Sequence, residues 1–129
     1  MPSIEISCPI YPSEDPEKVR EAILKVFPDA DLEMSEDDIT GTAGSIERFS
    51  KQIRKQKILD TTRSVLIHGK RGDRTRFFLN KQVAFIGKIS FCEEKTILGT
   101  IKVVITDDDL DDLIDKVAPV TVDGEEVIL

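Results

Sequence analysis

The feature that most constrains the fold is a two-residue period in two neighbouring segments. Apolar residues, mostly β-branched or aromatic, recur at every second position in residues 83–91 and again in residues 97–105. This period is typical of β-strands that bury one face. The segments therefore predict two strands, joined by the polar residues 93–96.

The same reasoning predicts further strands elsewhere in the chain. Residues 4–10 alternate in the same way, and residues 32–35 and 39–43 form two shorter runs around the acidic turn 36–38. Residues 76–79 are expected to be extended. Asp123-Gly124, between apolar residues, predicts a small hairpin at the C-terminal end.

Apolar residues at helical spacing predict four helices, over residues 16–27, 46–57, 58–68 and 106–117. A short irregular or helical piece is expected to begin at Asn80, and residues 70–74 have the composition of a loop. We therefore predict one α+β domain spanning residues 1–129. It is a two-layer domain, with a mostly antiparallel sheet and helices packed on one face.

Charge is divided into three blocks along the chain, which carries a net −7 in total. Residues 1–47 carry −9 and residues 89–129 carry −8. Residues 48–88 contain 12 Lys and Arg and only two acids, Asp60 and Asp73, for a net +10. A basic segment within an acidic chain is the pattern expected of a phosphate-binding surface.

The candidate RNA-binding residues are the bases and amides of this segment. They are Arg48, Lys51, Arg54, Lys55, Lys57, Arg63, Lys70, Arg71, Arg74, Arg76, Asn80, Lys81, Gln82 and Lys88. Arginine suits this role because its planar guanidinium binds phosphate through two hydrogen bonds. Aromatic residues are few here, so we expect recognition of the backbone of structured or duplex RNA rather than base stacking.

Few residues point to catalysis or to a cofactor. His68 is the only histidine, and no nucleotide-binding or hydrolase motif is present. The acidic run 107–115 is expected to be the solvated start of a helix rather than a metal site. We therefore expect a non-catalytic protein with no metal or cofactor.

Cellular location follows from two further patterns. Cys8 and Cys92 form no CxxC motif and are expected to be reduced. No apolar run is long enough to span a membrane, and no signal peptide is recognised. Both observations favour a cytoplasmic protein.

Several stretches resemble a small archaeal protein family described as predicted RNA-binding. They are residues 76–84, 87–88, 98–99 and 56–66, the last including Asp60, Thr61 and Arg63. The resemblance spans nearly the whole chain. It implies RNA binding and a fold similar to the five-S-RNA-binding ribosomal protein, which is also compared with double-stranded-RNA-binding domains. Some members are described as predicted exosome subunits, which implies a role in a larger RNA-processing complex.

The alternative interpretation is a protein–protein assembly module. In that case the basic face meets an acidic partner, for example the acidic surface of a second copy in a homodimer.

Overall fold

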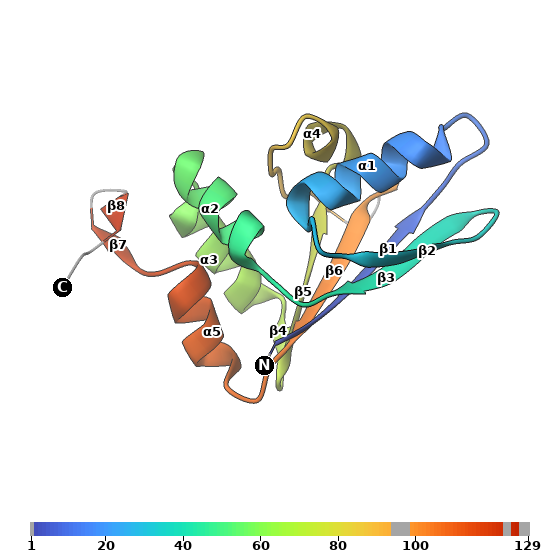
Figure 1. Ribbon diagram of the computed structural model, residues 1–129. Coiled ribbons are helices and arrows are strands. Elements are labelled where there is room, and N and C mark those ends of the chain that lie inside the picture. The colour runs from blue at the N-terminus through green and yellow to red at the C-terminus, as the bar shows by residue number, and fades with distance from the viewer. Residues whose placement is uncertain (1, 94–98, 123–124, 127–129) are drawn as a thin grey trace.

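In the computed structural model, which describes residues 2–93, 99–122 and 125–126, an antiparallel sheet of six strands is covered on one face by helices (Figure 1). The strand order is β2-β3-β1-β6-β5-β4. This arrangement confirms the predicted α+β class. The elements in chain order are β1 (Ser3–Pro9), α1 (Pro16–Val26), β2 (Asp31–Met34), β3 (Asp38–Ala43), α2 (Glu47–Lys55), α3 (Leu59–His68), β4 (Lys70–Arg71), β5 (Arg74–Leu79), α4 (Lys81–Phe85), β6 (Ile101–Thr106), α5 (Leu110–Val117), β7 (Thr121–Val122) and β8 (Glu125–Glu126).

Strand β1 lies near the centre of the sheet, and its sequence explains why. Ile4, Ile6 and Cys8 are buried on the helix side, whereas the residues between them face the other way. β1 pairs antiparallel with β3 on one side and with β6 on the other. Since β6 has the same alternation, with Ile101, Val103 and Ile105 buried, the strands form one continuous apolar face.

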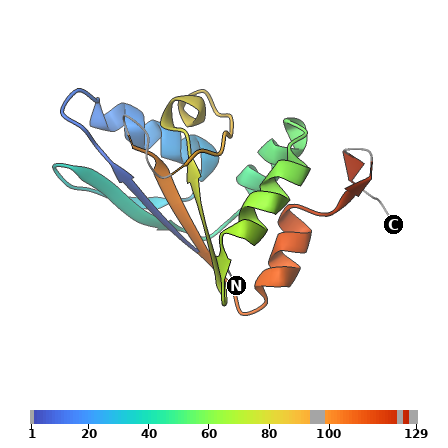
Figure 2. The same cartoon turned by 180° about the vertical axis from the view of Figure 1, so that it is seen from behind.

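The helices form two groups on that apolar face. Figure 2 shows α1 and α4 together at one end of the sheet and α2, α3 and α5 at the other. Phenyl rings join the helices to the sheet. The Phe49 ring of α2 stacks on Phe27 at a centroid distance of 6.1 Å and lies tilted against Phe77 of β5 at 5.5 Å. All three rings are buried. The core therefore lies between one face of the sheet and the helices.

The predicted strand 83–91 is wrong. Residues 81–85 form helix α4, which begins at Asn80, where the side-chain Oδ1 accepts a hydrogen bond from the Val83 amide. The helix is followed by Gly87 with a φ of +79°, a backbone conformation that glycine adopts readily. The alternation was misleading because Ala84, which the strand pattern placed outside, is buried. The short piece expected at Asn80 is confirmed as helical.

The other predicted strand is confirmed in part. Residues 97–98 of the predicted segment 97–105 and residues 94–96 of its turn lie outside the described residues, and β6 begins at Ile101. Residues 70–74, predicted as a loop, instead form a tight hairpin in which Arg71 pairs with Arg74. Gly72, with a φ of +65°, lies in its two-residue turn.

The remaining elements follow the predictions closely. A break between α2 and α3 occurs at Lys57, the one described non-glycine residue with a positive φ. Helix α5 is capped by Asp109, whose side chain accepts from the Asp112 amide. β7 and β8 form the expected hairpin, although Asp123 and Gly124 lie outside the described residues. No helix among the described residues is long and apolar enough to cross a membrane.

Candidate nucleic-acid interface

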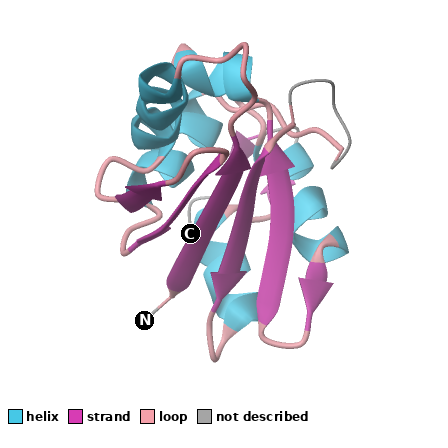
Figure 3. Ribbon diagram, turned by 90° about the vertical axis from the view of Figure 1, so that its right-hand side faces the viewer, coloured by secondary structure: helices cyan, strands magenta, loops and turns pink. Residues whose placement is uncertain are grey.

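The face of the sheet opposite the helices is uncovered, and it carries two kinds of charge. Figure 3 looks onto this open face, with the helices behind the strands. On β4, β5 and β6, the residues that alternate with the buried ones include Arg71, Arg74, Arg76 and Lys102. We call these four residues the open-face cations. Three of them belong to the predicted site, and Lys102 does not.

The open-face cations line a cavity of about 720 Å³ along the outer edge of β5. We call it the β5 cavity. The end of helix α3 contributes Ser64, Val65 and His68, and the segment after α4 contributes Phe91 and Cys92. β4 pairs only with Arg74 and Thr75 of β5. Further along this edge the Arg76 amide donates to the Gly69 carbonyl oxygen, and the Cys92 amide donates to the Phe78 carbonyl oxygen, so the cavity lies between these two contacts.

Phe78 is half-buried in this cavity and has a cation on two sides. Lys102 lies directly opposite Phe78 on the neighbouring strand, and the Arg76 guanidinium carbon lies 5.7 Å from the centroid of its ring. Arg76 and Phe78 are two residues apart on β5, so both side chains lie on the open face. The β5 cavity therefore combines an aromatic ring with positive charge.

The described part of the chain places no acidic partner beside the open-face cations. Among the residues that the structure describes, no carboxylate lies within ion-pair distance of Arg74, Arg76 or Lys102, and the cavity lining contains no acid. Arg71 donates to two backbone carbonyl oxygens, those of His68 and Lys70. An anion that enters the cavity therefore meets cations for which no described carboxylate competes.

The other half of the open face is acidic. Glu5 of β1 and Asp31 and Glu33 of β2 line a second hollow of about 490 Å³. It shares Lys102 and Val104 of β6 with the β5 cavity, so the two hollows meet at β6. One sheet face therefore changes from positive to negative across its width.

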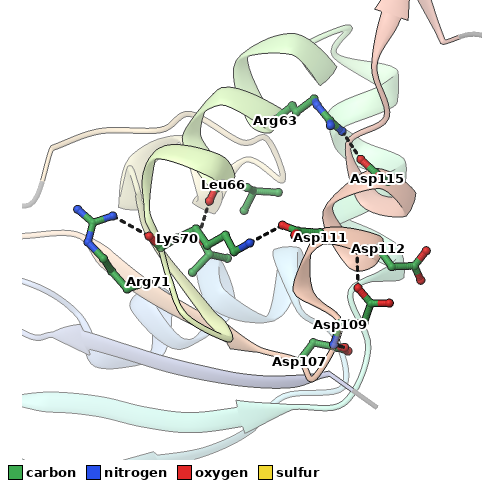
Figure 4. Close-up of polar contacts among 10 residues, drawn as sticks. Arg63, Leu66, Lys70, Arg71, Asp107, Asp109, Asp111, Asp112 and Asp115 are labelled. Atoms are coloured by element: carbon green, nitrogen blue, oxygen red, sulfur yellow. Dashed lines mark hydrogen bonds and ion pairs between the residues drawn. The ribbon is translucent and has the colours of Figure 1, made fainter.

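Two predicted binding residues are instead paired with helix α5. Arg63 lies 2.8 Å from Asp115, and Lys70 lies 2.5 Å from Asp111 (Figure 4). Arg63 also donates to the buried carbonyl oxygen of Ala118. The acidic run 107–115 was predicted to be the solvated start of a helix, and this is confirmed. Asp109 caps α5, and the side chains of Asp111 and Asp115 remain 76% and 62% exposed although they pair with Lys70 and Arg63. No group of three or more acidic, Cys or His residues in the described part of the chain is arranged to hold a metal ion.

Three more predicted residues have structural partners. Arg54 donates to the carbonyl oxygens of Lys116 and Val117, at the C-terminal end of α5. Asn80 caps α4. Lys81 is only 7% exposed, and its ammonium lies 2.5 Å from the Pro9 carbonyl oxygen and 3.0 Å from Glu14 Oε1. None of the three side chains points freely to solvent.

The remaining predicted residues are exposed but do not join the open-face cations. Arg48, Lys51 and Lys55 lie on the exposed side of α2, whose buried Phe49 packs against Phe77 on the inner side of β5. They therefore lie on the opposite side of the molecule from the open face. The others in this group are Lys57, Gln82 and Lys88, all exposed. The basic segment is thus divided between two surfaces and the interior.

Sequence reasoning missed the contribution of Lys102, His68 and Cys92 to the cavity. Lys102 lies in an acidic part of the sequence and reaches the site only because β6 pairs with β5. The alternation in residues 97–105 already placed Lys102 opposite the buried side chains, and this was the available signal.

Both cysteines are free thiols, and burial raises the pKa of each. Cys8 is buried on the inner face, and this burial raises the pKa of its thiol to about 11, although the nearby Lys81 acts in the opposite direction. Cys92 is half-buried at the β5 cavity, where burial also raises its pKa. The cavity therefore holds a thiol that a reagent can reach.

Comparison with known proteins gives one family and several relatives. A family model described as RNA binding matches residues 3–106. A UPF0200/UPF0201 protein of Archaeoglobus fulgidus is 42% identical over 96% of this chain, which spans only 39% of that relative's length. A UPF0201 protein of Methanothermobacter thermautotrophicus is 38% identical, with 92% of each chain covered.

Among solved structures, the crystal structure of a UPF0201 protein from Methanococcus jannaschii is similar over nearly its whole length. It is 34% identical, covers 98% of this chain and 99% of its own, and has a TM-score of 0.90. The fold described above is therefore also that of a solved archaeal structure.

Proposed function

This chain belongs to the archaeal family described as RNA binding, and from that premise we propose that it binds the phosphate backbone of structured RNA through the open-face cations. One observation supports this choice of surface: four cations line one cavity in which none of the described lining residues is an acid. The acidic half of the same face repels phosphates, so contact is restricted to β4, β5 and β6. The rest of the acidic chain is then excluded from the interface.

The salt dependence of binding tests this proposal. Each phosphate that the protein neutralises releases condensed counterions, so four contacts give a slope of about −3 to −4 in log K against log salt. Fluorescence anisotropy with a labelled RNA hairpin measures this slope. An affinity that does not change with salt concentration is incompatible with the proposal.

Two matched triple variants identify the surface. Replacing Arg71, Arg74 and Arg76 by Ala lowers the slope by about 2 to 3, because three phosphate contacts are lost. Replacing Arg48, Lys51 and Lys55 by Ala changes the net charge by the same amount on the α2 side. We expect this control to retain most of the slope. Equal losses in both variants contradict binding at the open face, provided that circular dichroism shows both to be folded.

Three more specific expectations about the fold, the complex and catalysis remain predictions. The likeness to the five-S-RNA-binding ribosomal protein and the link to the exosome rest on the sequence resemblance alone. Binding without catalysis is likewise a proposal; it rests on the lack of a recognised catalytic motif in the sequence.

Self-association is the second candidate function, and the division of charge on the open face favours it. A two-fold axis parallel to the strands would lay β5 of one copy over β3 of the other, so that each basic half meets an acidic half. Light scattering tests this, since such a dimer dissociates as salt is raised. A monomer at all salt concentrations contradicts it.

A further inference from the structure

We infer that the β5 cavity accepts one unpaired nucleotide of the bound RNA, with its base against Phe78 and its phosphate among Arg74, Arg76 and Lys102. This inference rests on the proposed function and deepens it. It also revises the sequence-based expectation that base stacking plays little part.

The dimensions of the cavity support a ligand of this size. Its volume of about 720 Å³ is in the range of pockets that hold small molecules, so a base and its phosphate fit but a duplex does not. A paired base within a helix cannot reach Phe78 without leaving the stack. The nucleotide must therefore come from a bulge, a loop or a single-stranded end.

The cavity is part of the framework rather than a gap between mobile side chains. On the inner side its wall is Phe91, whose ring packs edge-on against Phe49 and Phe77 at centroid distances of 6.3 and 5.8 Å. At the α3 end Gly69 approaches β5 so closely that a Cβ there would lie 2.2 Å from the Arg76 carbonyl oxygen. Larger residues at 69 would push α3 away and alter the cavity.

Phe78 has the surroundings expected of a stacking residue. In the structure the Arg76 guanidinium lies over the ring, which is the arrangement of a weak cation–π contact. A base that stacks on Phe78 displaces this guanidinium, which then turns to the phosphate of the same nucleotide. Lys102, opposite Phe78, binds that phosphate from the neighbouring strand. One side-chain movement thus exposes the ring and supplies a phosphate ligand.

The acidic half of the open face fixes the direction from which RNA arrives. Glu5, Asp31 and Glu33 lie beyond Lys102, so a phosphate chain that continued across β1 would meet negative charge. The strand is therefore expected to enter and leave past His68 and Arg71, at the β4 end of the cavity.

The test compares two RNAs and two phenylalanines. One RNA is a fully paired duplex, and the other is the same duplex with a single bulged adenosine. Phe78→Leu removes the stacking ring, and Phe85→Leu is a matched control. Phe85 is also half-buried and has a cation over its ring, since Lys25 lies 4.6 Å from the ring centroid, but it lies on α4 on the helix side.

We expect the native protein to bind the bulged RNA about tenfold more tightly than the duplex, as one stacked base allows. Phe78→Leu should abolish this preference and leave duplex binding and its salt slope unchanged, whereas Phe85→Leu should retain the preference.

Equal affinities of the native protein for the two RNAs overturn the inference. If duplex binding still depends on salt in that case, the proposed function is preserved. If neither RNA binds at low salt, the proposed function is wrong, and the inference that rests on it is overturned as well. A dimer that dissociates with salt and binds no RNA assigns the face to a second copy and also overturns the inference.

A measurement on the unaltered protein guards against a misfolded variant. Bulged RNA should slow alkylation of Cys92 several-fold, because this thiol lines the cavity. Cys8, 1% exposed, is the internal reference for unfolding. An unchanged rate at Cys92 under saturating RNA overturns the inference.

Discussion

The same residue types occur on both sides of the sheet, buried on the helix side and accessible on the open face. Phe77 and Phe78 are neighbours on β5, yet Phe77 is 2% exposed and packs against Phe49, whereas Phe78 lies half-buried in the β5 cavity. Lys81 is bound by Glu14 in the interior, and Lys102 lies on the open face with no described acidic partner. Residue type alone therefore does not separate structural from functional side chains; the face on which each lies does.

This contrast explains why net charge is an imperfect guide to the binding surface. Counting charges along the chain treats Lys81 and Arg76 alike, although only Arg76 is available to a ligand. Helix α5 shows the same effect, because its acids pair with Arg63 and Lys70 of the basic segment. The part of the positive charge that remains on the open face is what a partner encounters.

The largest expected effect is on the free energy of unfolding, and it distinguishes Lys81 from Lys102. Lys81→Met leaves the Glu14 carboxylate buried without its cation, and we expect it to lower the free energy of unfolding by about 3 kcal/mol. Lys102→Met removes a cation on the open face and should change stability by less than about 0.5 kcal/mol. Urea denaturation measures both values.

RNA binding should show the reverse order for the same two variants. Folded Lys81→Met should bind RNA as the native protein does, whereas Lys102→Met should lose about one phosphate contact in its salt slope. If Lys81→Met is as stable as the native protein, the interpretation of Lys81 as a structural residue is wrong.

The sequence predicted most of the fold because burial in this protein follows simple periods. Ile4, Ile6 and Cys8 on β1 and the apolar face of α1 were visible as alternation and as helical spacing. The segment around Val83 failed, because the same apolar residues fit either a strand or a short helix. Here the Asn80 cap and packing against α1 decided the outcome.

The candidate site was harder to predict because it is assembled by strand pairing. Arg74 and Arg76 were among the predicted residues, but Lys102 is 26 positions from Arg76 and joins them only across the β5–β6 pair. Equally, nothing in the local sequence around Lys81 shows that Glu14 lies beside it. Such partners depend on tertiary contacts, which periodicity along one chain does not specify.

An effect of intermediate size is expected on the pH dependence of stability. Here the contrast is between Cys8 on the inner face and Cys92 at the β5 cavity. Cys8 has a folded-state pKa of about 11 against an ordinary value of 9.0, so the folded protein retains a proton that the unfolded chain loses. The corresponding stability is fully present below pH 9 and is lost as pH rises toward 11, which amounts to about 2 kcal/mol between pH 8 and pH 10.5. Urea denaturation of native protein and Cys8→Ala at pH 8 and pH 10.5 measures it. The native protein should lose more stability over this range than the variant, whereas Cys92→Ala should behave nearly as the native protein does. Parallel losses in native protein and Cys8→Ala contradict the role of this thiol.

The smallest effect concerns the acidic half of the open face. Replacing Glu5 by Gln, Asp31 by Asn and Glu33 by Gln removes the repulsion beside Lys102 and should tighten RNA binding about threefold at low salt. The gain should disappear near 0.5 M salt, because exposed charges are then screened within roughly 4 Å. A control that neutralises Glu17, Glu21 and Glu47, which are exposed on helices α1 and α2, changes net charge equally and should gain less affinity.

The variant at Glu5, Asp31 and Glu33 also separates the two candidate functions. Loss of the acidic half should abolish a dimer that pairs unlike halves, whereas an RNA-binding monomer only gains affinity. An equal gain in both variants would show that RNA responds to the total charge of the molecule rather than to the division of this face.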